Sequence, residues 1–117
     1  MSISSINALA FYKEVRESGV IWGIKDNGGF PAPKNSDGQR AMPFWSSKSK
    51  ALSIIENVPA YKHFQPVAIS WAEFIERWVP GLTQDGMLVG INWSGKNASG
   101  YDLEPVELQK NVERQSE

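Results

Sequence analysis

Hydrophobic positions along the chain switch between helical spacing and short apolar runs, most clearly between residues 70 and 93. Ser70 and Glu73 have the spacing of a capping box, and Pro80-Gly81 predicts the end of the helix that follows it. The apolar side chains between them recur at the i, i+3, i+4, i+7 and i+8 positions of one helix face: Trp71, Phe74, Ile75, Trp78 and Val79. Residues 87–91 then form an apolar run typical of a buried strand.

The remaining segments are predicted from the same periodicities and from turn residues. Strands are expected at residues 20–24, at 30–34 after an Asn-Gly hairpin turn, at 39–45 and at 65–69. Because of the two prolines within 30–34, we expect that strand to be either an edge strand or a loosely paired one. Helices are expected from Ser4 or Ser5 to Glu17, from a cap at Ser46 to about Asn57, and from Pro105 to about Arg114.

This order of elements predicts an α+β fold in one domain spanning residues 1–117, ordered from about residue 4 to about residue 114. We expect a mixed sheet of three to five strands, built from an N-terminal hairpin and two β-α-β units, with helices packed on it. In those units, strands 39–45, 65–70 and 87–93 would run parallel, and their carboxyl ends would meet on one side of the sheet.

Composition narrows the classes of function. The 117 residues are 41% hydrophobic and 21% charged, as in ordinary globular proteins. The absence of cysteine excludes disulfides, zinc–thiolate sites, iron–sulfur clusters and a cysteine nucleophile. A net charge of −1 gives no general basis for binding nucleic acid or membranes. Without a signal peptide or an apolar run near the ~20 residues of a membrane span, we expect a soluble, cytoplasmic protein.

Tryptophan–serine pairs mark the ends of the three strands expected to be parallel: Trp45-Ser46, Ser70-Trp71 and Trp93-Ser94. Ligands of open parallel sheets bind at the carboxyl ends of strands, where helix N-termini attract anions. One interpretation is that Trp45 and Trp93 lie close together, partly exposed, and dock a protein partner. A second is that the serines at these ends, with nearby lysines, hold a phosphate or carboxylate group. The complete candidate set is Trp45, Ser46, Lys48, Trp93, Ser94 and Lys96.

Catalytic and metal-binding patterns are sparse. His63 is the only histidine, and no spacing indicates a nucleophile–histidine–acid arrangement or a metal-ligand cluster. Serines such as Ser46 and Ser70 are equally explained as ordinary helix caps. We therefore predict no catalytic residue, no metal ion and no cofactor, and a monomer or weak homodimer without a nucleic-acid or membrane partner.

Several sequence pieces together resemble a known family. They are Val20-Ile-Trp-Gly-Ile24, Met42-Pro-Phe-Trp-Ser46, Pro66-Val-Ala-Ile69, Phe74-Ile-Glu-Arg-Trp-Val-Pro-Gly-Leu82, Asp85-Gly86 and Gly90-Ile-Asn-Trp93. This pattern is similar to the bacterial proteins grouped as domain of unknown function 2750 (DUF2750), from about Phe11 to Leu108. The resemblance implies one domain and no established activity.

From these observations we expect a non-catalytic protein-binding or regulatory module. The alternative is a protein, enzymes included, that binds a small ligand or an anion at the strand ends near Ser46 and Lys96.

Overall fold

A computed structural model describes residues 3–96 and 98–114. The helices are α1 (Ile3–Ser18), α2 (Lys48–Asn57), the short η1 (Pro59–Tyr61), α3 (Trp71–Glu73), η2 (Phe74–Trp78), α4 (Val79–Gln84) and α5 (Pro105–Glu113). The strands are β1 (Val20–Lys25), β2 (Ala41–Phe44), β3 (Gln65–Ser70), β4 (Leu88–Ser94) and β5 (Ser99–Leu103). The chain is thus a mixed α+β domain, as the sequence predicts.

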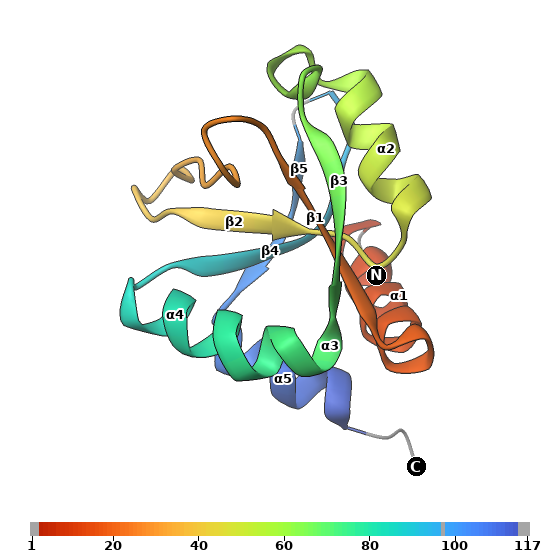
Figure 1. Ribbon diagram of the computed structural model, residues 1–117, viewed down its shortest axis with the longest axis vertical. Helices are drawn as coiled ribbons and strands as arrows, with labels where there is room; N and C mark the ends of the chain where they lie inside the picture. The colour runs from red at the N-terminus through yellow and green to blue at the C-terminus, as the bar shows by residue number, and fades with distance from the viewer. Residues whose placement is uncertain (1–2, 97, 115–117) are drawn as a thin grey trace.

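The strands form two sheets that cross each other (Figure 1). One sheet pairs β1 antiparallel with β3; the other has the order β2-β4-β5, in which β2 and β4 are parallel and β5 is antiparallel to β4. A backbone bridge links β1 to the residue that follows β2: the amides of Trp22 and Trp45 each donate to the other's carbonyl, at 2.8 and 2.7 Å. This residue pair joins the two sheets by hydrogen bonds.

The predicted N-terminal hairpin is wrong. The turn forms, with an Asp26–Gly29 bridge, but β1 pairs with β3 and residues 30–34 are not a strand. Pro31 and Pro33 have no N–H to donate to a ladder, so this segment keeps only one bridge, between Lys34 and Arg40.

The two predicted β-α-β units are also wrong, because β3 belongs to the other sheet. The parallel neighbours are β2 and β4 themselves, and α2, β3 and the helix after it all lie in the connection between them. Periodicity identifies a strand but not its partner. Strand β5 was missed, because its polar, glycine-containing start resembles the loop before it.

The helix from Trp71 to Gln84 runs through Pro80, so the predicted stop there is wrong. A π-helical turn just before the proline accommodates it, with the Val79 amide donating to the Phe74 carbonyl five residues back. Pro80 therefore lies within a continuous helix and not at its end. The predicted cap at the other end is confirmed, since the Ser70 hydroxyl accepts from the Glu73 amide at 3.1 Å.

Gly86 ends this helix through a left-handed backbone, with φ of +68°. The Gly86 amide donates to Thr83 at 3.1 Å and the Met87 amide to Leu82 at 3.0 Å, which is the bonding pattern of a Schellman motif.

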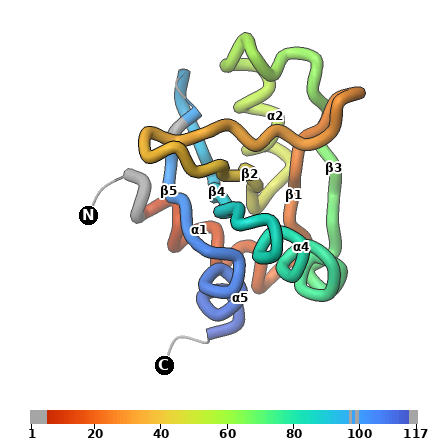
Figure 2. Tube along the Cα trace, turned by 90° about the vertical axis from the view of Figure 1, so that its left-hand side faces the viewer, coloured from red at the N-terminus to blue at the C-terminus, as the bar shows by residue number. Residues whose placement is uncertain are grey.

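Helices cover both faces of the three-stranded sheet. Figure 2 shows α1 and α5 side by side, with α2 on the far side of the strands. On the α1–α5 side the core includes Phe11, Val15, Phe44, Ile91 and Leu108. On the α2 side the buried residues are Ile24, Ala41, Trp45, Ala51, Ile54, Ile55, Val58, Tyr61 and Trp93.

Candidate functional site

Trp45 and Trp93 lie together, as predicted, because the Trp45 indole Nε1 donates to the Trp93 carbonyl at 2.9 Å. Their predicted exposure is wrong: the side chains are 0% and 7% exposed and belong to the core beneath α2. The two rings therefore do not form an exposed aromatic patch.

A β-bulge in β4 explains the position of Trp93. Asn92 has a left-handed backbone, with φ of +47°, and the register of β4 against β5 shifts between Ile91 and Ser94. One extra residue changes which side chains share a face, so that Trp93 covers Gly90 three residues back. A Cβ at Gly90 would lie 2.3 Å from the Trp93 ring. The Gly-x-Asn-Trp motif is thus a packing unit.

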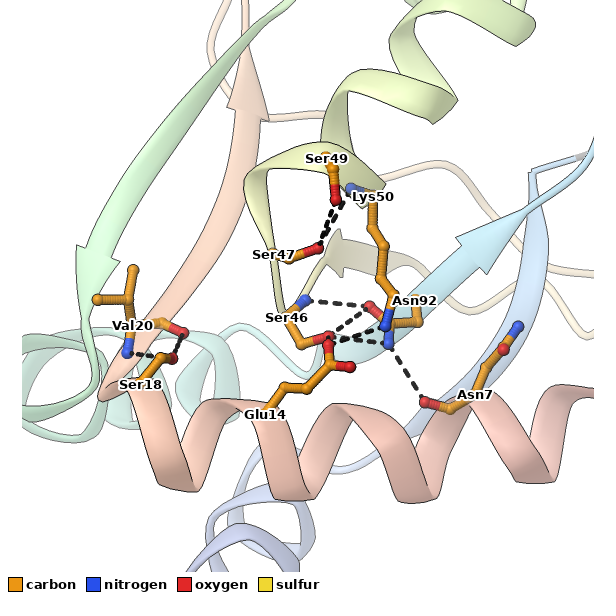
Figure 3. Close-up of polar contacts among 9 residues, drawn as sticks. All are labelled: Asn7, Glu14, Ser18, Val20, Ser46, Ser47, Ser49, Lys50 and Asn92. Carbon is orange, nitrogen blue, oxygen red and sulfur yellow. Dashed lines mark hydrogen bonds and ion pairs between the residues drawn. The ribbon is translucent and has the colours of Figure 1, made fainter.

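The same bulge turns Asn92 toward α1, where it joins a cluster that we call the polar junction: Glu14, Ser46, Lys50 and Asn92 (Figure 3). The Ser46 amide donates to Asn92 Oδ1 at 3.0 Å, and Asn92 Nδ2 donates to Ser46 Oγ at 3.1 Å and to the Asn7 carbonyl at 3.2 Å. Ser46 Oγ and Lys50 Nζ both donate to Glu14 Oε1, at 2.5 and 2.8 Å.

The electrostatics of the polar junction favour an ionised Glu14. Burial alone would raise the pKa of this carboxyl, but the hydrogen bonds from Lys50 and Ser46 and the positive charge of Lys50 outweigh it and lower the pKa. Among the described residues, every buried side-chain nitrogen and oxygen has a hydrogen-bond partner. The junction therefore ties α1, the start of α2 and β4 to one another.

The predicted role of Ser46 as a helix cap is wrong. Ser47 caps α2 by accepting from the Lys50 amide at 3.3 Å, while Ser46 is buried in the junction. Lys48 is exposed on the first turn of α2 and contributes nothing to the junction, where Lys50 takes the place expected for it.

The other predicted site residues divide between two hollows. A cavity of about 110 Å³ adjoins the polar junction at the carboxyl ends of β2 and β4, and Ser94 and Lys50 line it with both tryptophans. Lys96 instead lines an open groove of about 390 Å³ together with Lys34, Asn35, Tyr61 and Asp102. The strand-end set is thus only partly brought together.

Two groups in that groove have shifted ionisation. Burial raises the pKa of the Asp102 carboxyl, although the Trp93 indole Nε1, which donates to Asp102 Oδ1 at 2.9 Å, acts in the opposite direction. Burial also raises the pKa of the Tyr61 hydroxyl. A half-buried carboxyl with a raised pKa, in a groove that two lysines also line, makes this groove the second candidate site.

The residues that the sequence prediction missed are Glu14, Asn92 and Asp102, and Lys50 was expected only as one of the lysines near an anion site. Glu14 and Lys50 are 36 positions apart, and helical periodicity contains no sign of their contact. The role of Asn92 could have been predicted from the sequence, because an asparagine inside an otherwise apolar strand is typical of a left-handed backbone or a bulge.

The chain belongs to the family described as "Protein of unknown function (DUF2750)", whose model matches residues 8–112. This confirms the resemblance in the sequence.

Among solved structures, the chain is similar to Anabaena Tic22 (protein transport), with 18% identity and a TM-score of 0.43 over 71% of this chain. The chain spans 46% of that structure's length. No curated protein matches it. Within the described residues, no helix is both long enough and apolar enough to cross a membrane.

Proposed function

We propose that the chain is a non-catalytic module that binds a protein partner. The observation that carries this proposal is an apolar hollow of about 240 Å³ beside α4, which we call the α4 pocket. It is lined by Met42, Arg77, Trp78, Gly81, Leu82, Asp85 and Met87. Methionines with an aromatic wall are typical of surfaces that accept apolar side chains from other proteins.

The polar junction supports the proposal because it is a poorer binding site than the α4 pocket. Its side chains bind one another, so their hydrogen-bonding capacity is used to join α1, α2 and β4. The α4 pocket, in contrast, offers half-buried apolar side chains with no covering segment described. A location in the cytoplasm remains a prediction from the sequence.

The test is affinity capture from the native lysate with chemical cross-linking. Arg77→Glu and Met87→Glu change the α4 pocket, and Leu52→Glu is the matched control because Leu52 is 36% exposed on α2, outside the pocket. We expect wild type and Leu52→Glu to capture the same protein, and both pocket variants to lose it while keeping their circular dichroism. Equal capture by all four proteins would contradict the assignment of binding to this pocket.

A second candidate function is the binding of a small anion in the groove that contains Lys34, Lys96 and Tyr61. Two ammonium groups near a phenol hydroxyl suit a phosphate or carboxylate. Titration with inorganic phosphate, followed by NMR, tests it: shifts at Lys96 and Tyr61 in wild type should disappear in the Lys34→Ala/Lys96→Ala double variant. Identical shifts in both proteins would rule this groove out.

A further inference from the structure

Gly81 is a glycine that the chain itself does not require. It lies inside α4 with an ordinary helical backbone, and a Cβ added there would meet nothing within 4 Å. Gly90 differs sharply, because a Cβ there would lie 2.3 Å from the Trp93 ring. A glycine inside a helix destabilises it relative to alanine, because glycine loses more backbone freedom on folding. Neither backbone conformation nor internal packing offsets this cost at Gly81.

The free space at Gly81 opens into the α4 pocket. Positions 77, 78, 81, 82 and 85 share one face of the helix, which runs below β2 and β4 in Figure 1. The Trp78 ring is held as a wall by edge-on contacts to Phe30 and Phe44, at centroid distances of 4.8 and 5.7 Å. At about 240 Å³ the pocket is below the ~300 Å³ at which typical small-molecule sites begin. It is the right size for one side chain.

Opposite charges stand at the two ends of this face. Arg77 and Asp85 are both exposed and line the pocket. Arg77 and Asp85 are eight positions apart along the helix, which is about 12 Å at ~1.5 Å per residue. Within the described residues, the ion pair that forms is Lys50–Glu14, so neither of these charges is neutralised inside the chain.

We infer that the α4 pocket receives one large apolar side chain from a short segment of a partner protein, an inference that rests on the proposed function. The absent Cβ of Gly81 lets that side chain reach the helix backbone, between Trp78 and the methionine side chains. The same segment carries an acidic residue facing Arg77 and a basic residue facing Asp85, which fixes its direction along the helix.

The test uses a phage-displayed library of random 12-residue peptides selected on the wild-type protein. Gly81→Leu fills the pocket from within. Gln84→Leu is the matched control, since it adds the same side chain to an exposed position of α4 that does not line the pocket. Both variants should fold, because Gly81 has free space and Gln84 faces solvent; thermal melts check this.

We expect enriched peptides to share one apolar residue between an acid and a base. They should bind wild type and Gln84→Leu equally and Gly81→Leu at least tenfold more weakly. In NMR spectra they should shift the Trp78 indole N–H signal, identified with Trp78→Phe.

Peptides that bind Gly81→Leu as tightly as wild type would overturn this inference but leave the proposed function standing, because lysate capture tests that separately. The absence of any enriched peptide would also overturn it. So would self-association of the wild type that Gly81→Leu abolishes, because the occupant would then be a second copy of the chain.

Discussion

Replacing Asn92 tests whether the bulge in β4 holds the polar junction together. The Asn92 side chain accepts from the buried Ser46 amide at 3.0 Å and donates to the Asn7 carbonyl at 3.2 Å. Removing the side chain leaves the Ser46 amide without this partner in a buried site. A buried group left unsatisfied costs about 1–3 kcal/mol, and the loss of the second bond adds about 1 kcal/mol. Asn92→Gly should therefore lower the free energy of unfolding by about 2–4 kcal/mol.

Asn92→Ala removes the same hydrogen bonds but adds backbone strain. At φ of +47° a glycine is relaxed, whereas the alanine Cβ is crowded against the backbone. We expect Asn92→Ala to be less stable than Asn92→Gly by about 1 kcal/mol, even though alanine is elsewhere the more stabilising residue.

Urea unfolding followed by tryptophan fluorescence measures both variants, with the midpoint and slope compared to wild type. Asn92→Asp is a further control, because it keeps an acceptor for the Ser46 amide and loses the Nδ2 donor to Ser46 Oγ and to the Asn7 carbonyl. If Asn92→Ala proved as stable as Asn92→Gly, the left-handed bulge would not exist in solution. If Asn92→Gly cost less than about 0.5 kcal/mol, the junction would not be buried as described.

Four further substitutions test packing and ionisation elsewhere in the domain. Gly90→Ala should lower the free energy of unfolding by about 1–3 kcal/mol through overpacking against Trp93, whereas Gly81→Ala should raise it by about 0.5–1 kcal/mol; urea melts of the two compare directly. Glu14→Gln should be less stable than wild type at neutral pH, and the difference should shrink as the pH falls below about 4.5, because the folded-state pKa of Glu14 is lowered and its contribution is lost through that range. Asp102→Asn should be more stable than wild type at neutral pH, since burial raises the Asp102 pKa and ionised Asp102 opposes folding; thermal melts should show this advantage vanishing toward acid.

Local patterns predicted most of the elements but not their arrangement. The helices α1, α2 and α5, the cap at Ser70 and the strands at 20–25, 65–70 and 88–94 depend on neighbouring residues, so they can be predicted from the sequence. Pairing depends on residues far apart, such as Ile21 with Ile69 in β1 and β3. The continuation through Pro80 required a π-turn, whose hydrogen bonds no periodicity records.

The candidate site was predicted in the same partial way. The carboxyl ends of two parallel strands do meet, and Trp45, Ser46 and Trp93 meet there. The burial of these three residues and the hydrogen bond from Ser46 to Glu14 depend on the position of α1. Local sequence patterns do not specify that position. The α4 pocket was missed because spacing assigned Trp78 to the core and Pro80-Gly81 was interpreted as the end of the helix.

The packing of α1 against α5 has a consequence for synthesis of the protein. Arg16 Nε donates to the Val112 carbonyl at 2.7 Å, and Asn111 Nδ2 donates to the Tyr12 hydroxyl at 3.2 Å, so the first helix is completed by the last. During translation, Phe11 leaves the ribosome long before residues 105–113 do. Until those residues emerge, the apolar face of α1 lacks the helix α5 that packs against it in the folded protein. The nascent chain therefore depends on late contacts of high sequence separation, and shielding by a chaperone should matter most during this interval.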